Sequence, residues 1–394
     1  MAGLARGDLG RNAMTSSGMA LSPITRFRKH DARRRGLPRM GLPGLRRSRT
    51  ARCLCNRAWY ARIARFGAET TTVPGMISAT RQLNLWDHLS KFFAPHNREL
   101  RVPTIGTQNV VALQTLMRLR EDLPDGAANV TVDFSECAEL ALSALVFLGG
   151  LVSLVKASGG TVNVRKDTIR PKLRLEWEKN GFLTHLGTPS STLVTDAVPF
   201  EHHPELDKDR VMKYLEGKWI GVGAVRLSED LQAAIIGKVW EIYTNAFEHA
   251  ESPIGVMNCG RYDKKRHRLH LCVMDFGIGI PDNVRKHKPG ITIDSGSAMR
   301  WAFLNGSSTK ADAVGYSRGL GLHILKEFIR VNKGKLEVYS NDGFVRIKSQ
   351  SEIYRRTTAR FPGTLVNITL EADERFYCFG YEVEKYAKTS GQGY

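Results

Sequence analysis

The sequence is poor in cysteine and in long apolar runs, and both absences exclude classes of protein. The six cysteines show no paired spacing typical of a structural metal site, because Cys53 and Cys55 lack a second pair downstream. Cys272 lies in an apolar stretch, which suits a reducing compartment without disulfides. The most apolar stretch, Leu140 to Val155, is too short and too interrupted by Gly and Ser to span a bilayer, which takes roughly 20 residues. We therefore expect a cytoplasmic protein without a membrane span.

Acidic residues are scarce in the first 75 positions, and most of the net charge of +19 is concentrated there. This segment has 16 basic residues, 15 of them Arg, against three acidic ones, whereas the remainder has 42 basic and 36 acidic residues. Three interpretations are open: a disordered basic arm that contacts nucleic-acid phosphates, an organelle transit peptide, or residues upstream of a working start at Met76. We favour the third, because alternating apolar patterning begins at Met76. Without such an arm, we do not expect nucleic acid as a partner.

The stretch around which the rest of the chain is organised runs from Trp240 to Ala250. Apolar residues recur at helical spacing before and within it, and Ser228 is a candidate N-cap, so the sequence predicts a helix whose second half is this stretch. Glu241 and Asn245 are four residues apart and therefore lie one turn apart on the same face. A carboxylate beside a carboxamide can hold a hydrated divalent metal ion, and the carboxylate can also accept a proton. An isolated pair of this kind is usually solvated, but here two glycine clusters follow it.

The first glycine cluster comes directly after a predicted strand, Leu269 to Met274. Asp275 therefore lies at a strand end, where a lone carboxylate can accept a hydrogen bond from an exocyclic amine. Gly277 and Gly279 in the turn beyond let a flat ring approach the backbone. Taken alone, the cluster is equally well explained as an ordinary turn.

The second glycine cluster, Gly315 to Leu322, opens another predicted helix. Backbone N–H groups at a glycine-rich helix start form an anion site. An ordinary turn is again the competing interpretation. Further along, Pro362-Gly363-Thr364 leads into a predicted strand that ends at Leu370.

In this order and spacing, the four pieces resemble the GHKL nucleotide-binding family, which includes gyrase, the Hsp-type chaperone, histidine kinases, MutL and the anti-sigma serine kinases. The resemblance covers about residues 228–370 and implies an ATP site, with Mg²⁺, on an α/β sandwich. Glu241 would match the family's general base and Asn245 its magnesium ligand. Asp275 would match the adenine-reading carboxylate, with Thr364 beside it.

The resemblance also implies contacts to the rest of the nucleotide. The first glycine cluster would flank the base, and the second would hold the phosphates. Residues 282–318 would form a mobile lid whose basic residues reach the phosphates, although a charge on a lid is usually only solvated. The further nucleotide-binding positions are Gly277, Gly279, Lys310, Arg318, Gly319, Leu320 and Gly321.

A second α/β pattern precedes this module, with a strand ending near Asp133, a buried helix and a glycine pair before a Val-rich strand. The pattern resembles the STAS family of anti-anti-sigma factors over about residues 100–188. That family carries a phosphorylated serine at the start of the buried helix, where this chain has Leu142. Ser143 could substitute, but we interpret it as a small residue that packs under the helix. The resemblance therefore implies a docking or sensing module.

Together these patterns predict an α/β fold, in which a STAS-like α/β domain precedes a GHKL α/β sandwich with a mixed sheet covered by helices. In the first domain we expect helices at 110–120, 142–157 and 172–180 and strands at 129–134 and 161–164. Asn341-Asp342-Gly343 predicts a hairpin turn, and residues 351–360 predict a loop. The expected segments are a basic segment 1–75, a STAS-like domain with its lead-in 76–188, a linker 189–226, an ATP-binding domain 227–372 and a tail 373–394.

Two classes of function are open. The first is an enzyme, a Mg²⁺-dependent ATPase or a serine/threonine kinase of the anti-sigma regulatory class in bacterial signalling, which acts on a regulatory protein partner. The second is a non-catalytic switch, in which ATP controls what the STAS-like module binds. We favour the enzyme, because a pure binding switch needs no base at Glu241. Either could form a homodimer.

Overall fold

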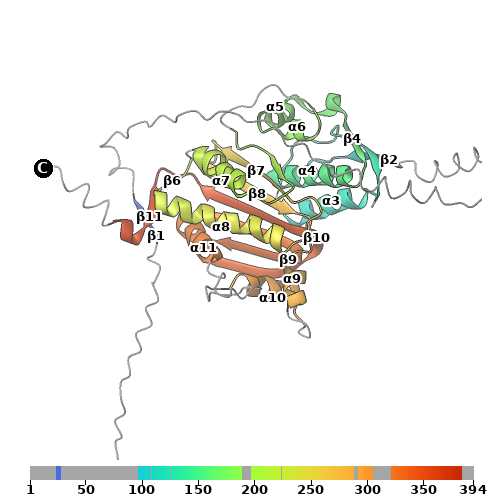
Figure 1. Cartoon of the computed structure of the whole chain (residues 1–394). Helices are drawn as coiled ribbons and strands as arrows, with labels where there is room; N and C mark the ends of the chain where they lie inside the picture. The colour runs from blue at the N-terminus through green and yellow to red at the C-terminus, as the bar shows by residue number, and fades with distance from the viewer. Residues whose placement is uncertain are drawn as a thin grey trace, which may run out of the picture. The chain divides into compact units, whose positions relative to one another are not determined.

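The computed structural model describes residues 24–27, 96–107, 109–124, 126–188, 197–222, 224–287, 292–304 and 321–383. Contacts divide the chain into two compact units, of which one comprises residues 1–31 and 96–394 and the other residues 32–95. All described residues belong to the first unit, which has a mixed α/β fold, as the sequence predicts (Figure 1). Within the described ranges, no helix combines the length and the apolar character needed to cross a membrane.

Residues 96–188 form a small domain around a parallel sheet. Its strands lie in the order β2 (His96–Arg101), β3 (Ala128–Asp133) and β4 (Thr161–Val164). Its helices are α3 (Val110–Glu121), α4 (Leu142–Ala157), α5 (Pro171–Lys179) and α6 (Phe182–His185). The five helices and strands expected here are confirmed, each to within one residue at either end.

Local signals explain where two of these helices begin. The side chain of Asn109 caps α3 by accepting a hydrogen bond from the backbone N–H of Ala112 at 2.9 Å. Pro171 starts α5, where its missing N–H costs nothing. Helix α4 has no such cap, and nearly every side chain in it is buried, so packing rather than local sequence holds it in place.

The C-terminal part is built on a five-stranded sheet in the order β5-β7-β8-β10-β9. Every neighbouring pair is antiparallel, so the mixed sheet expected here is wrong. The strands are β5 (Glu201–His203), β7 (Val256–Asp263), β8 (Arg268–Asp275), β9 (Lys335–Lys348) and β10 (Ser351–Glu371). Helices α8 (Glu229–Glu248) and α11 (Gly321–Asn332) pack side by side over one face (Figure 1). Helices α9 (Ile280–His287) and α10 (Ser295–Ala302) lie against β9, and α10 also contacts β10.

The hairpin turn predicted at residues 341–343 is wrong. Strand β9 continues through them to Lys348, and residues 351–360, predicted as a loop, belong to β10. Asn341 has a φ of +48°, a conformation that Asn tolerates, and the pairing of β9 with β10 is irregular at this point. The Asn-Asp-Gly signal therefore marks a bulge within a long strand.

Residues 197–222, inside the expected linker, are packed into the fold. Strand β5 extends the sheet beside β7, and α7 (Lys208–Tyr214) continues into a π-helical turn (Leu215–Trp219). Tyr214 and Trp219 are fully buried in the same cluster as α8. The prolines and serines near residues 189–204 predicted a linker, whereas the apolar residues that pack this stretch into the fold lie farther along it.

Three histidines in the described chain are held neutral by burial. Burial lowers the pKa of His185, His203 and His270 to about 4 in each case. Both ring nitrogens of His203 lack a hydrogen-bond partner, and its ring lies 5.8 Å from that of Tyr243, whose hydroxyl also lacks one. Below pH 6.5 the unfolded chain therefore binds protons that the folded chain does not.

We expect this difference to destabilise the fold as the pH falls from 6.5 towards 4. As the pH falls from 7 to 5, each histidine should lower the free energy of unfolding by about 2 kcal/mol. Urea unfolding of the wild type and His203→Gln at both pH values isolates the share of His203, because every other titrating group cancels in the comparison. Equal pH dependence in the two proteins would contradict the prediction.

A second small sheet joins segments from opposite ends of the chain. Strand β1 (Ile24–Phe27) pairs antiparallel with β11 (Phe376–Phe379), which pairs in parallel with β6 (Arg226–Leu227). Tyr377 of β11 is fully buried against Phe328 of α11, so the aromatic tail packs on the body. The position of β1 differs from the expectation that residues 1–75 are disordered or lie upstream of the working protein.

Removal of β1 should therefore destabilise the C-terminal part. A chain that begins at Met76 leaves the antiparallel edge of β11 unpaired, and the backbone carbonyl of Tyr377 in that strand holds the N–H of Ser228 at the start of α8 at 2.9 Å. We expect the melting temperature to fall by several degrees. A truncation that begins just before Ile24 serves as the control, and an unchanged melting temperature for the Met76 chain would show that β1 is dispensable.

Candidate functional site

A cavity of about 550 Å³ lies among α8, the end of β8, α9, α10 and β10. It brings together positions that the sequence singled out, although they come from separate elements of the chain. Those that line it are Glu241, Asn245, Asp275, Gly279 and Thr364. Gly277 lies in the turn beside it, and Gly321 is the first residue of α11. Lys310, Arg318, Gly319 and Leu320 lie outside the described residues.

Helix α8 presents the Glu241–Asn245 pair to this cavity. Ser228 caps the helix as predicted, because its Oγ accepts a hydrogen bond from the Leu231 N–H at 3.3 Å. Most of the predicted apolar stripe, including Leu231, Ile235 and Val239, is buried on another face of the helix. Burial of that stripe fixes the rotation of the helix, so Glu241 and Asn245 are held at the cavity.

Lys238 forms an ion pair with the Glu241 carboxylate. Its Nζ lies 2.7 Å from Glu241 Oε1, one turn earlier on the same helix, and about a third of the Glu241 side chain is exposed. The pair holds one carboxylate oxygen and leaves the other available to a ligand. Lys238 was not among the residues predicted from the sequence, although its i,i+3 spacing from Glu241 is typical of an ion pair on a helix.

Asp275 is the buried acid of the site. It ends β8, its side chain is only 4% exposed, and its Oδ1 accepts a hydrogen bond from the Gly277 N–H at 2.8 Å. Burial raises the pKa of this carboxyl to about 7, and the backbone N–H groups of Gly277 and Thr364 offset part of that rise. A carboxylate that lines a cavity and is nearly free of solvent strongly favours a further hydrogen-bond donor there.

The glycines around Asp275 allow close approach of the backbone. A Cβ on Gly277 would lie 2.1 Å from the Ala250 carbonyl oxygen, and one on Gly363 would lie 2.1 Å from that of Asp275. Gly363 also has a φ of +120°, which side chains rarely adopt. These contacts explain both glycines by packing within the chain, whereas the sequence analysis attributed Gly277 to the approach of a flat ring.

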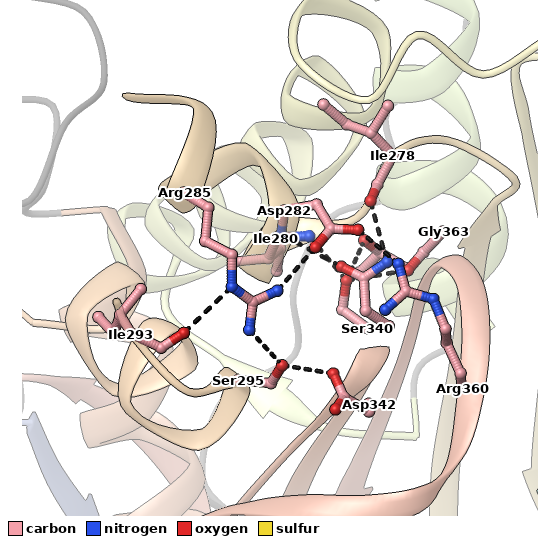
Figure 2. A network of polar contacts seen from close by, with 12 residues as sticks. Ile278, Ile280, Asp282, Arg285, Ile293, Ser295, Ser340, Asp342, Arg360 and Gly363 are labelled. Atoms are coloured by element: carbon pink, nitrogen blue, oxygen red, sulfur yellow. Dashed lines mark hydrogen bonds and ion pairs between the residues drawn. The ribbon is translucent and has the colours of Figure 1, made fainter. Parts of the chain in front are cut away.

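A network of polar contacts joins the turn after Asp275 and α9 to β9 and β10 (Figure 2). Ser340 Oγ accepts a hydrogen bond from the Ile280 N–H at 2.7 Å and lies 2.9 Å from the Gly363 carbonyl oxygen and 3.0 Å from the Thr364 hydroxyl. The side chain of Asn341 bridges the Ile278 carbonyl at 3.0 Å and the Asp282 N–H at 3.3 Å. The turn after Asp275 is thereby fastened to β9 and β10.

Arg285 extends the network from α9 to α10. Its guanidinium contacts the Asp282 carboxylate at 2.7 Å, the Ile293 carbonyl at 3.1 Å and the Ser295 hydroxyl at 2.8 Å (Figure 2). Asp282 is also held by Arg360 of β10 at 2.6 Å. The described part of the expected lid, residues 282–287 and 292–304, is therefore packed against β9 and β10.

The apolar part of the cavity lining was not predicted from the sequence. It includes Trp301 of α10, Phe303 and Leu304 directly after that helix, and Trp240 of α8. The cap of α10 was a usable signal, because the side chain of Asp294 accepts a hydrogen bond from the Ser297 N–H at 3.1 Å. An apolar wall opposite a few polar groups is the usual composition of a site for a flat organic ligand.

Among the described residues, no three His, Cys, Asp or Glu side chains gather in a way that could hold a metal ion by themselves. A divalent cation at Asn245 would therefore need oxygen ligands from a bound molecule, as is common for Mg²⁺. A scan against models of known protein families finds no match to this chain, and a search of curated proteins finds none either.

Proposed function

We propose that the protein binds ATP with Mg²⁺ in this cavity, as a member of the GHKL type. We further propose that it transfers the terminal phosphoryl group to water or to a serine or threonine of a partner protein. The observation that carries the proposal is the convergence on one cavity of a carboxylate–carboxamide pair from α8 and a buried carboxyl from the end of β8. Adenine needs a hydrogen-bond acceptor for its amino group, and a divalent cation needs oxygen ligands. These residues supply both.

The adenine end would bind at Asp275. An exocyclic amine donates a hydrogen bond to a carboxylate, and the burial of Asp275 makes that bond strong. The Thr364 hydroxyl lies at the same edge of the sheet, since Thr364 pairs directly with Asp275. The apolar wall formed by Trp301 and Phe303 offers surface to the faces of a flat ring.

The phosphate end would lie along α8. Asn245 supplies an oxygen ligand for Mg²⁺, which when bound would neutralise charge on the phosphate oxygens. Glu241 would orient the attacking hydroxyl or water and accept its proton. Lys238, at 2.7 Å, would hold the Glu241 carboxylate in one rotamer for that purpose. In this proposal the two carboxyl groups have separate roles: Asp275 accepts a hydrogen bond from adenine, and Glu241 acts as the general base near the phosphates.

We also propose a cytoplasmic role in signalling, with a regulatory protein as partner. In this proposal residues 96–188 act as the STAS-like docking or sensing module, and Leu142 at the start of α4 excludes that position from phosphorylation. A second candidate function is a switch in which ATP binding alone changes the module's contacts. The packing of α4 against β7 and β8 favours it, because that packing gives a direct route from the cavity to the module.

The test is incubation of the full-length protein with Mg²⁺ and γ-labelled ATP, with free phosphate and protein-bound label counted separately. Free phosphate would identify an ATPase, and label on the protein would identify a kinase. Tight binding with neither product would favour the switch. If equilibrium dialysis detected no ATP binding at millimolar concentration, the proposal would be overturned.

A further inference from the structure

Helix α4 of the N-terminal domain packs closely against the sheet that carries Asp275. The close contact with this sheet is made at Gly150, the second of two consecutive glycines in the middle of the helix. A Cβ added to Gly150 would lie 2.5 Å from Phe276 Cε2 and 2.6 Å from Met274 Cε. A Cβ added to Gly149 would lie 2.4 Å from Phe200 Cζ. At these distances the neighbouring side chain would have to move, so both positions exclude every larger residue without rearrangement.

The ring beneath Gly150 belongs to the residue that follows Asp275. Phe276 lies in a cluster of aromatic rings, with its centroid 5.4 Å from that of Phe147 on α4 and 6.1 Å from that of Phe361 on β10. The Phe147 and Phe361 centroids are 5.8 Å apart. All three rings are buried in one core cluster that spans the small domain and the sheet. Phe276 therefore has no free space into which it could retreat.

Asp275 and Phe276 act on opposite sides of the sheet. Asp275 lines the cavity, whereas Phe276 packs against the small domain. Phe276 directly follows Asp275, the last residue of β8, so we expect a displacement of the Phe276 ring to shift the backbone that places the Asp275 carboxyl. The position of that carboxyl is further limited by Gly363, whose Cβ site lies 2.1 Å from the Asp275 carbonyl oxygen.

We propose that α4 is a positioning element for the nucleotide site, in which Gly150 and Phe276 set the place of the Asp275 carboxyl. The proposal rests on the assignment of the cavity as an ATP site. The small domain thereby becomes part of the machinery that sets ATP affinity. The coupling is reciprocal, so a nucleotide bound at Asp275 must also change the stability of the contact between α4 and the sheet.

The two glycines provide a matched pair of variants. Gly150→Ala pushes on Phe276, whereas Gly149→Ala adds the same methyl group one residue earlier and pushes on Phe200, which lies in the segment before β5. Both should lower the melting temperature to a similar extent. We expect only Gly150→Ala to weaken ATP binding, by about tenfold, a typical size for coupling between sites. Phe147→Leu removes a ring contact with Phe276 without adding bulk, and it should also weaken ATP binding. This variant replaces Gly150→Ala if Gly150→Ala does not fold.

A readout without nucleotide separates this proposal from the assignment of the cavity. The Gly277 N–H donates to Asp275 Oδ1 at 2.8 Å, so its hydrogen exchange reports on the carboxyl's position. In the absence of ATP we expect faster exchange of this amide in Gly150→Ala than in Gly149→Ala. In the wild type, ATP should slow exchange along α4.

The outcomes are distinct. If the wild type fails to bind ATP but the Gly277 amide still exchanges faster in Gly150→Ala, the ATP assignment fails and the positioning contact remains. Equal ATP affinity and equal Gly277 exchange in folded Gly149→Ala and Gly150→Ala would overturn the proposal, as would equal weakening by both variants.

Discussion

Asp275→Asn should lose ATP binding by about 100-fold or more and at the same time become more stable. In the complex with ATP, the side-chain NH₂ group of Asn would face the amino group of the base, which donates a hydrogen bond to the carboxylate in the wild type. Two donors would then face each other, and a buried polar group would be left unpaired. The gain in stability follows from the raised pKa of about 7. Because the unfolded chain has an ordinary aspartate pKa near 3.9, ionisation of Asp275 destabilises the fold increasingly from about pH 4 to pH 7 and by a constant amount above it.

Above pH 7, ionisation of Asp275 lowers the free energy of unfolding by about 4 kcal/mol at most, and Asn, which does not ionise, removes this loss. The measurements are isothermal titration with ATP and thermal unfolding at pH 5 and pH 8. The stability advantage of the variant should be large at pH 8 and small at pH 5. Normal ATP affinity in Asp275→Asn would show that the pocket is placed wrongly.

Asp133→Asn provides the matched control for this substitution. Asp133 also ends a strand, is buried, and accepts a hydrogen bond from the N–H two residues later, at 2.7 Å from Ser135. That backbone hydrogen bond, with help from the Ser135 side chain and Arg165, lowers the pKa of Asp133. Its replacement should therefore destabilise the fold near neutral pH and leave ATP affinity unchanged, the opposite of the result at Asp275.

Glu241→Gln should keep ATP binding and lose turnover by about 10²–10⁴, the usual contribution of a positioned base. Gln has the same shape and keeps a hydrogen-bond acceptor near Lys238, so the helix and the cavity should be undisturbed. Steady-state release of phosphate, together with ATP affinity by titration, tests the expectation. Glu229→Gln, at the exposed N-terminal end of the same helix, is the control. Equal loss in both variants would mean that Glu241 has no role as a base.

Periodicity predicted those parts of the site that a single element determines. The stripe of α8 and its cap at Ser228 placed Glu241 and Asn245 on one face, and the run before Asp275 placed that residue at a strand end. These signals lie within one turn or one strand of the residue they position, so they can be recognised without knowledge of the fold.

The remaining features depend on partners that lie far away in the sequence. Nothing near Asn341 indicates that its amide is used by Ile278 and Asp282, so the Asn-Asp-Gly signal predicted a hairpin that the chain does not form. The environment that sets the pKa of Asp275 includes Thr364 of β10, which pairs with it across the sheet and lies far away in the sequence. Likewise, the pairing of β1 with β11 joins residues from the two ends of the chain, which no local pattern encodes.

The packing of α4 against the sheet also affects the order in which the chain is made. Phe147 leaves the ribosome long before Phe361, its partner in the aromatic cluster, because about 200 residues separate the two. At a rate of synthesis of roughly 5–20 residues per second, the apolar surface of α4 is made on the order of 10–40 s before the strand that covers it. We therefore expect this apolar surface to be exposed during synthesis, and slowed translation of the second half should increase aggregation of the nascent chain.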